Sequence, residues 1–379
     1  MAAVIYDYVR SPFHRAHKGA LKDVRPEDFG GEIVQEIIAR TGISGEQVED
    51  LLLGCAYPEG EQGLNLGRIL TYMSGLPNSV PGSTTNRLCG SSMQAIHDAA
   101  GAISMGSGDL FVCAGVETMS RVQRGGFNRT PHPSLESRFP EAYINMGLTA
   151  ENLAKSHQID RTRQEIFALT SHQKAAAAES DGLFDQELVS ISGSDGVISH
   201  DGCIRADSTL ESMARLKPAF LEDGVVTAAT SSPLTDGAAA CLVASSEIVD
   251  TMDGEPLAEV VATAVAGVSP EIMGIGPVPA TQKALQRADL TLEDMGVIEL
   301  NEAFSAQSLA VMQDLGLSDD DERVNIDGGA LAIGHPLGAS GARITGKAAS
   351  LLKRTGEEFA LATMCIGGGM GISTILRRF

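Results

Sequence analysis

The stretch NRLCGSSMQAIHDAA, residues 86–100, places a cysteine at the point where a tight turn runs into a helix. Its first seven residues are rich in turn formers, and the residues from Met93 onward carry apolar side chains at helical spacing. An apolar run at 110–115 follows, and such a run is typical of a buried strand. Loop, helix and strand together form one α/β unit.

The same order of segments returns late in the chain. The loop GHPLG at 334–338 precedes a helix-like segment at 340–352 and the apolar run FALATMC at 359–365. The segments 29–54 and 281–301 also match, each with an amphipathic helix, a turn capped by Ser or Thr, and a strand. The sequence therefore predicts two copies of one α/β unit, with sheets covered by helices on both faces.

Between the copies lies a segment of different character, residues 121–237, which is rich in Arg, Pro, Ser and His and lacks regular periodicity. We expect it to be an inserted loop domain. The N-terminal half would then comprise 1–120 and 238–256, and the C-terminal half 257–379. The arginines of the insertion are compatible with an anionic ligand and equally with an ordinary solvated surface.

Composition excludes several classes of function. The net charge of −21 and the absence of Trp argue against nucleic-acid or anionic-membrane binding. The N-terminal MAAVIYD is typical of a first strand rather than a signal peptide, and no apolar run approaches the ~20 residues of a transmembrane helix. We expect a cytoplasmic protein. Its six scattered cysteines form no CxxC pair, so they predict thiols and no metal site.

Cys89 is the strongest candidate for a catalytic residue. A helix N-terminus favours the thiolate, and its free N–H groups can stabilise an oxyanion. A buried cysteine is more often structural. However, Gly90 and the two serines that follow it indicate a tight strand-to-helix turn, of the kind that exposes a nucleophile.

Two further glycine-rich motifs carry reactive side chains. His335 lies between glycines at the repeat position of Cys89, and an imidazole of near-neutral pKa is the natural base for a thiol, although a structural loop histidine is the alternative. Cys365 ends an apolar strand and opens IGGGMG, where glycines indicate close approach of a ligand. That second thiol would shuttle a proton, or the loop would cradle a phosphate; a P-loop is excluded because no Lys-Ser/Thr follows.

Four motifs in this order resemble the thiolase family along the whole chain: NRLCGSS at 86–92, NEAF at 301–304, GHPLGASG at 334–341 and CIGGG at 365–369. The resemblance implies a five-layered αβαβα sandwich of two repeated halves, with an inserted loop domain that covers the substrate. It also implies a homodimer or homotetramer, and it allows an enoyl-CoA hydratase/3-hydroxyacyl-CoA dehydrogenase subunit as a partner.

The resemblance implies a role for each motif. Cys89 would take the acyl group, His335 would activate it, and Cys365 would move a proton at the α-carbon of the acetyl unit. Asn301, through a water, would join His335 in stabilising the enolate oxygen. The backbone N–H groups of Cys89 and Gly367 would form a second oxyanion hole.

The resemblance also implies contacts for the substrate and for coenzyme A, which would be a co-substrate rather than a permanently bound cofactor. The CoA path would be lined by Ser232, Arg205, Ser212, Ala219 and Phe220, and the acyl pocket by Met146, Met273 and Phe304. Each of these residues also has a plain interpretation as loop packing or a solvated surface group.

The predicted function is a degradative 3-ketoacyl-CoA thiolase of the fatty-acid oxidation β-subunit type. Asn145 stands where short-chain biosynthetic enzymes of the family typically have His, which favours longer acyl chains. An acetyl-CoA acetyltransferase working in the condensing direction is the alternative, and a non-catalytic lipid carrier or scaffold is a more distant one. A decarboxylating ketoacyl synthase would be expected to lack the second cysteine.

Overall fold

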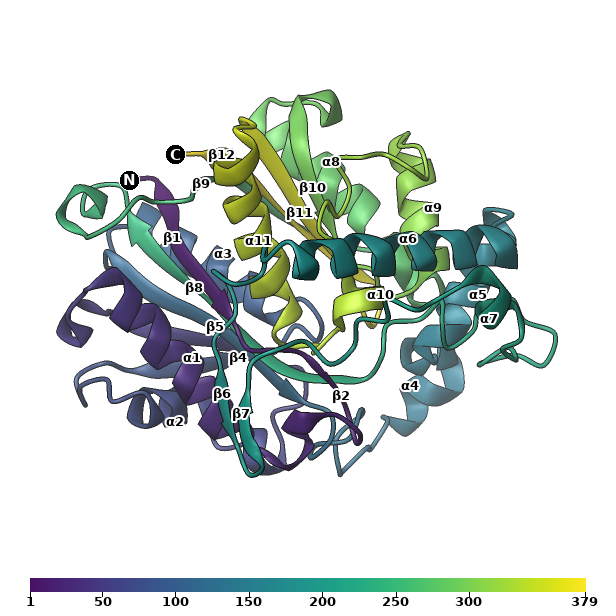
Figure 1. Cartoon of the computed structure of the whole chain (residues 1–379), viewed down its shortest axis with the longest axis horizontal. Coiled ribbons are helices and arrows are strands. Elements are labelled where there is room, and N and C mark those ends of the chain that lie inside the picture. Colours follow the sequence, from purple (N-terminus) through teal and green to yellow (C-terminus); the bar gives the residue numbers. More distant parts are fainter.

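The computed structural model describes residues 1–379 as a continuous ten-stranded mixed sheet flanked by helices (Figure 1). The strand order is β10-β11-β12-β9-β1-β8-β5-β3-β4, and β2 (His14–Arg15) pairs with β8 off this path. The N-terminal set comprises β1 (Ala3–Arg10), β3 (Asp50–Gly54), β4 (Gly82–Thr85), β5 (Leu110–Thr118) and β8 (Thr235–Ser245). The C-terminal set comprises β9 (Ala258–Gly267), β10 (Met295–Leu300), β11 (Phe359–Ile366) and β12 (Met370–Arg378).

The two sets of strands meet only at a short junction, where two residues of β1 pair with two of β9. Two helices, α3 (Ser91–Ser104) and α11 (Ser340–Thr355), lie between the sets and contact strands of both. One core cluster accordingly contains side chains of both helices and of both sets. This arrangement supplies the central layer of the sandwich.

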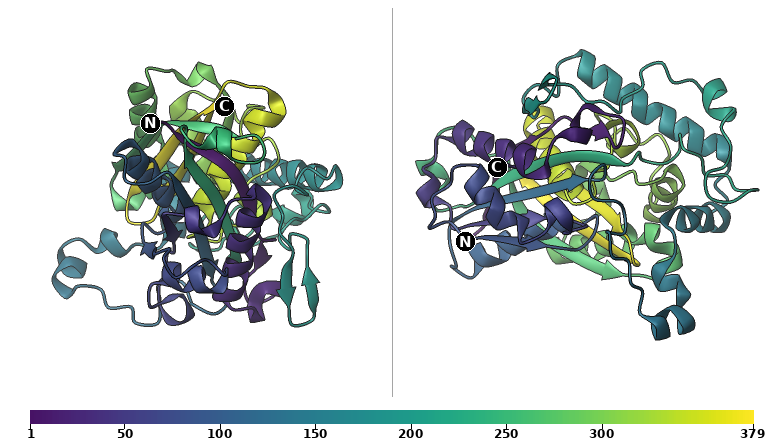
Figure 2. Two further views of the ribbon diagram at one scale, coloured as in Figure 1. Left: turned by 90° about the vertical axis from the view of Figure 1, so that its left-hand side faces the viewer. Right: turned by 90° about the horizontal axis from the view of Figure 1, so that it is seen from below.

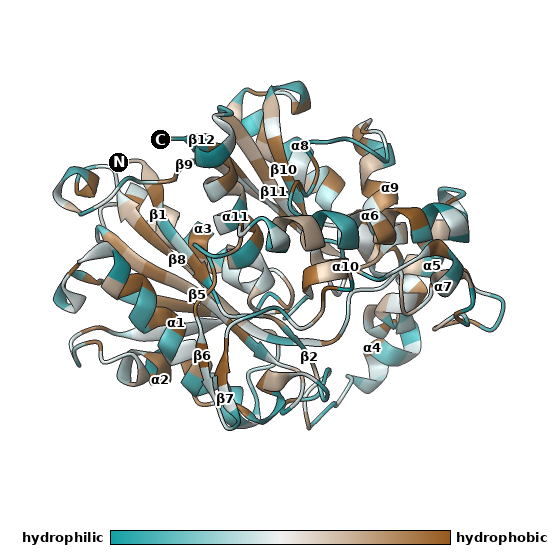
Figure 3. Ribbon diagram, viewed as in Figure 1, coloured by the Kyte–Doolittle hydropathy of each residue, from teal (hydrophilic) through white to brown (hydrophobic).

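The outer layers are formed by other helix pairs. α1 (Pro26–Thr41) and α2 (Leu66–Met73) cover the N-terminal strands, and α8 (Pro277–Ala288) and α9 (Ser305–Leu315) cover the C-terminal ones. Hydrophobic residues are frequent along the strands (Figure 3), and those of the strands and of these helices form shared buried clusters. The predicted five-layered αβαβα sandwich of two repeated halves is therefore confirmed.

Local signals in the sequence are confirmed as well. Ser44 and Thr291 each cap a short 3₁₀ turn with a capping box, directly before β3 and β10 respectively. The Ser44 N–H donates to Gln47 at 2.9 Å, and the Thr291 N–H donates to Asp294 at 2.8 Å. Each cap satisfies backbone donors locally, so the turn needs little help from tertiary contacts.

The segment between the halves contains α4 (Pro133–Arg138), α5 (Met146–Ser156), α6 (Arg161–Ser180), α7 (Leu210–Ala214) and the hairpin of β6 (Ile191–Gly193) and β7 (Gly196–Ile198). α5 and α6 pack on α9, and α6 also contacts α10 (Ala330–Ile333). The stretch that carries α4 projects from the body (Figure 2). The remaining short 3₁₀ helices are Ala20–Asp23, Gly60–Gln62, Pro140–Tyr143, Val249–Thr251 and Pro270–Ile275.

Two observations concern the chain as a whole. None of its helices combines the length and the apolarity that crossing a bilayer requires. All six cysteines are free thiols, five of them buried and Cys89 partly exposed.

The N-termini of α3 and α11 approach each other closely. A Cβ placed on Gly115 of β5 would lie 2.4 Å from the carbonyl oxygen of Gly338 and 2.7 Å from Cβ of Ser92. The Ser92 hydroxyl in turn accepts a hydrogen bond of 2.8 Å from the N–H of Ala342. The loop before α11 is thereby held against the start of α3.

We expect Gly115→Ala to destabilise the protein, because the added methyl group meets backbone atoms that cannot rotate away; overpacking of this kind costs about 1–3 kcal/mol. Gly101→Ala on α3 is the matched control, since nothing lies within 4 Å of the added Cβ. That variant should be about 0.5–1 kcal/mol more stable than the parent. Urea denaturation measures both, and an unchanged stability of Gly115→Ala would contradict this account of the packing.

Candidate active site

Cys89 lies at a strained turn between β4 and α3. Leu88, immediately before it, has a left-handed backbone with φ of 46°, which is unusual for a leucine. The Ser91 hydroxyl stabilises the turn by accepting from the N–H of Arg87 at 2.9 Å and donating to the Leu88 carbonyl at 2.5 Å. The sequence predicted such a turn from the glycine and serines that follow the cysteine.

The backbone N–H groups at the helix start favour the Cys89 thiolate as expected, but burial outweighs them. Burial raises the pKa of Cys89 to about 11, although hydrogen bonds from the N–H of Gly367 and from its own N–H lower it. Desolvation of the charged form thus outweighs the backbone donors. Cys89 is a protonated thiol at neutral pH, and a base must remove its proton before it can attack.

His335 is held in one tautomer in the loop between α10 and α11. Its Nδ1 lies 2.5 Å from the Ser340 hydroxyl, which itself donates to the Pro336 carbonyl at 2.9 Å. Because that hydroxyl proton is already used, Nδ1–H must be the donor to Ser340. The lone pair therefore resides on Nε2, 3.4 Å from the side-chain nitrogen of Asn301.

The predicted near-neutral pKa of His335 is wrong. Burial, together with the positive charge of Arg343, lowers the pKa of His335 to about 3. The imidazole is consequently neutral through the physiological range, with an unprotonated Nε2. A neutral, oriented imidazole is competent to take a proton from a thiol.

Asn301 ends β10 beside this histidine. Its N–H donates to the Thr363 carbonyl at 3.0 Å, which fixes the backbone, whereas its side-chain oxygen is buried without a hydrogen-bond partner. An unpartnered polar atom next to a neutral base is suited to interact with a reacting group. The neighbouring Glu302 has a different task.

Glu302 is buried and fully engaged in hydrogen bonds. It accepts from the Ser171 hydroxyl at 2.6 Å, from the side chain of Asn325 at 2.7 Å and from the N–H of Leu331 at 3.1 Å. It thereby joins α6 and α10 to the end of β10, and supports the loop that carries His335.

Cys365 lies at the end of β11, and its sulfur is close enough to Cys89 for a charge on one to affect the other. Burial raises the pKa of Cys365 well above its usual range, and the Cys89 charge raises it further. A Cβ on Gly367 would lie 3.3 Å from Leu88 and 3.4 Å from the Met146 sulfur. The loops that carry the two cysteines therefore pack against each other.

Four of the five apolar residues predicted to contact the substrate or CoA lie in or on the buried cluster that contains Cys365. Met273 and Phe304 belong to the same buried cluster as this cysteine, and Met146 and Phe220 pack on it. The rings of Phe220 and Phe304 meet edge-on with centroids 5.9 Å apart. An apolar wall thus adjoins the second thiol.

The structure does not bring all the predicted CoA contacts to that cluster. Ser232 is adjacent, because its N–H and its hydroxyl both donate to the Ala303 carbonyl at 3.0 Å. Arg205, Ser212 and Ala219 are exposed on the inserted segment. Ser212 has a structural role there, since it forms the capping box of α7 with Thr209.

Sequence reasoning missed Glu117. This buried acid at the end of β5 accepts from the N–H groups of Ala56 at 2.8 Å and of Gly338 at 2.9 Å, and from the Gln62 side chain at 2.8 Å. It links the N-terminal half to the loop of His335. The available signal was a single acid near the end of an otherwise apolar run, LFVCAGVET.

Comparisons with known proteins show the family of the chain. Residues 3–247 match the thiolase N-terminal domain and residues 254–378 match the thiolase C-terminal domain. The chain belongs to the thiolase family. Its members are acyltransferases, so the chain is an enzyme of that class.

Individual relatives cover the whole chain. A 3-ketoacyl-CoA thiolase of Psychrobacter arcticus is 46% identical over 99% of this chain and 97% of its own length. The structure of human mitochondrial 3-ketoacyl-CoA thiolase in complex with CoA has a TM-score of 0.91 and 36% identity, covering 100% of this chain and 98% of its own. The acetyl-CoA acetyltransferase of Bacillus anthracis has a TM-score of 0.91 and 39% identity, covering 100% and 99%.

The two shifted pKa values predict an unusual pH dependence. With His335 near 3 and Cys89 near 11, neither changes protonation between about pH 5 and 9. Alkylation of Cys89 by iodoacetamide should therefore proceed at a nearly constant rate across that window. In His335→Ala the alkylation rate at pH 7 should be lower than in the parent. It should also rise about tenfold per pH unit, because only the thiolate fraction reacts.

Mass spectrometry of the Cys89 peptide measures these rates, with Cys89→Ala as the blank. A wild-type inflection near pH 6.5 would contradict the neutral state of His335.

Proposed function

We propose that this enzyme cleaves 3-ketoacyl-CoA with CoA, giving acetyl-CoA and a shortened acyl-CoA. The observation that supports the proposal most is that the thiols of Cys89 and Cys365 interact beside an apolar cluster, while Asn301 lies next to the neutral imidazole of His335. The relatives named 3-ketoacyl-CoA thiolase, matched over their full length, support this substrate class. CoA acts as a co-substrate, as the human complex with CoA supports.

The first half-reaction begins with proton transfer from the Cys89 thiol to Nε2 of His335. The sulfur attacks the 3-keto carbon, the C2–C3 bond breaks, and its electron pair leaves as the enolate of acetyl-CoA. Cys365 then donates its proton to the enolate carbon. Its raised pKa keeps this thiol protonated until a strongly basic carbon is formed.

Two sets of donors would stabilise the charges. Protonated Nε2 of His335 would donate to the enolate oxygen, joined by Asn301 through a water. The N–H groups of Cys89 and Gly367, which already reach the Cys89 sulfur, would hold the oxygen of the attacked carbonyl.

The second half-reaction runs through the acyl-cysteine. The Cys365 thiolate takes the proton of the CoA thiol, and the CoA sulfur attacks the acyl group. Cys89 leaves as thiolate and regains its proton from His335. All electrons and protons return to their starting positions, so the cycle is ping-pong.

An acetyl-CoA acetyltransferase is the second candidate, because the Bacillus anthracis enzyme of that name is 39% identical with the same TM-score. The same residues would run the cycle toward carbon–carbon bond formation. A non-catalytic carrier or scaffold is disfavoured, because Cys89, Asn301, His335 and Cys365 are all retained.

Several finer features belong to the same proposal. The chain divides into an N-terminal half of 1–120 and 238–256, a loop domain of 121–237 and a C-terminal half of 257–379. Arg205, Ser212, Ala219 and Ser232 contact CoA on the loop domain. The enzyme forms a homodimer or homotetramer, accepts a hydratase/dehydrogenase subunit as partner, and works in the cytoplasm.

Cys89→Ala should reduce thiolysis by at least about 10³-fold, because the covalent intermediate cannot form. No acyl-enzyme should be detected by mass spectrometry after mixing with 3-ketoacyl-CoA. Cys113→Ala, which removes a buried thiol of β5, is the matched control and should retain activity. A surviving burst of acetyl-CoA in Cys89→Ala would defeat the assignment of the nucleophile.

Steady-state thiolysis of a chain-length series separates the two candidate functions. Each methylene that enters the apolar cluster contributes about 0.8 kcal/mol, or about fourfold in kcat/KM. We therefore expect kcat/KM to rise from acetoacetyl-CoA to longer 3-ketoacyl-CoAs. A maximum at acetoacetyl-CoA would instead support the acetyltransferase.

A further inference from the structure

Arg10, at the end of β1, is buried among three chain segments far apart in sequence. Its Nε donates to Glu187 at 2.7 Å, and both terminal nitrogens donate to the two carboxylate oxygens of Asp201 at 2.8 Å. The Arg10 side chain is 0% exposed. The planar guanidinium thus satisfies two acids of the inserted segment in one fixed geometry.

Two aromatic rings also lie against this guanidinium. The rings of Phe13 and Phe184 have their centroids 5.3 and 5.2 Å from the central carbon of Arg10. These rings share a buried cluster with Ala332 and Ile333, the two residues directly before Gly334. Arg10 therefore supports the backbone that leads into His335.

A second, polar route leads from Arg10 to the same backbone. Asp201 also accepts the N–H of Phe13 at 2.7 Å, so its position is fixed on two sides. Two residues further on, the thiol of Cys203 contacts the hydroxyl of Thr235. That hydroxyl accepts the N–H of His335 at 3.0 Å.

The contacts around Gly334 leave little room for movement. Its φ of 112° lies in the region that favours glycine. A Cβ there would lie 2.7 Å from Thr235 and 3.4 Å from the Cys203 sulfur. A displacement of Cys203 or Thr235 would therefore move the backbone of His335.

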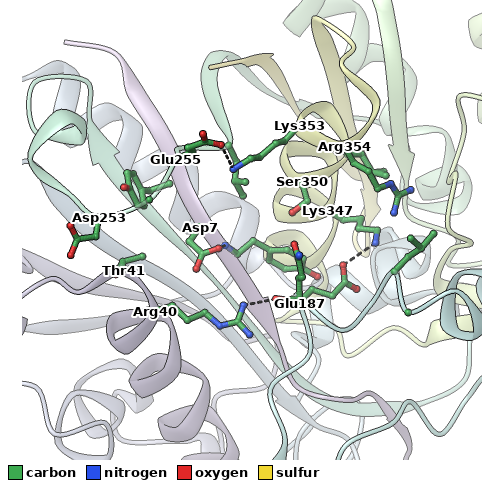
Figure 4. A pocket seen from close by; sticks show the side chains of 18 residues that line it. Asp7, Arg40, Thr41, Glu187, Asp253, Glu255, Lys347, Ser350, Lys353 and Arg354 are labelled. Atoms are coloured by element: carbon green, nitrogen blue, oxygen red, sulfur yellow. Dashed lines mark hydrogen bonds and ion pairs between the residues drawn. The ribbon is translucent and has the colours of Figure 1, made fainter.

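Glu187 ties the same network to α11. It accepts from Lys347 at 2.9 Å, and Figure 4 shows this pair at the edge of a cavity of about 730 Å³. Four basic and four acidic side chains line that cavity, so it offers no excess of charge to an anionic ligand. The Glu187–Lys347 pair instead holds α11 in place, and α11 also carries Ser340, the hydrogen-bond partner of His335 Nδ1.

We propose that Arg10, acting through Asp201 and through Phe13 and Phe184, is a positioning residue for His335. It holds the 332–335 backbone so that Nε2 faces the Cys89 thiol. The inference rests on the proposed function only in taking His335 as the base for Cys89.

The test is a double-mutant cycle read out by alkylation of Cys89 with iodoacetamide at pH 7. Asp201→Asn keeps the shape of the side chain but removes its charge. Asp321→Asn is the matched control, because Asp321 also accepts a two-pronged arginine (Arg323, at 3.0 and 2.8 Å) and one backbone N–H at 3.0 Å.

We expect Asp201→Asn to slow alkylation about tenfold and to introduce a rise in rate with pH, as a misplaced base would. In the His335→Ala background the same substitution should change the rate less than twofold. Asp321→Asn should alkylate like the parent in both backgrounds. Non-additivity of this kind is not produced by a merely structural role.

Equal losses in both backgrounds would overturn the positioning role, as would an unchanged rate in folded Asp201→Asn. If Asp201→Asn fails to fold in a thermal scan, Cys203→Ala enters the same cycle under the same criteria, since it removes the contact with Thr235 without exposing a charge. A His335→Ala enzyme that alkylates like the parent would refute His335 as the base. That result would overturn the proposed function, and it is distinguishable from every outcome of the double-mutant cycle.

Discussion

The close approach of two helix N-termini is the constraint on which the site depends. Gly115 and Gly341 leave no space for a side chain where α3 meets the loop before α11; a Cβ on Gly341 would lie 2.3 Å from the Met93 nitrogen. Each helix belongs to a different half and carries its own reactive loop. Packing of the central layer therefore brings the starts of α3 and α11 together, and Glu117 ties the loop of His335 to the segment that follows β3.

Burial sets the chemistry of the gathered groups. It raises the pKa of Cys89 and Cys365 and lowers that of His335, so all three are neutral at rest. A neutral site costs less to desolvate than a thiolate–imidazolium pair. In the proposed reaction, charge develops only during the chemical steps, beside the backbone N–H groups of Cys89 and Gly367.

The sequence predicted what local patterns determine. The hydrophobic periodicity and the capping residues located the strands and the central helices. Ser44 and Thr291 were identified as caps because their hydrogen-bond partners lie within three positions. The pKa shifts of Cys89 and His335 could not be predicted from local patterns, because burial depends on layers assembled across the whole chain. Glu117 was missed for the same reason, since its partners lie 55 to 221 positions away.

A buried network of charges seldom adds much net stability, because desolvation offsets most of the attraction between the charges. Removing one partner, however, leaves a charge unpaired and is costly, so the network strongly disfavours any other arrangement. The buried charges of Arg10, Glu187 and Lys347 form such a network. It joins β1, the inserted segment and α11. The segment that would cover the substrate is thus fixed to the helix whose first residues hold His335. The inserted segment and the helix that supports the proposed base are therefore joined by one buried network of charged side chains.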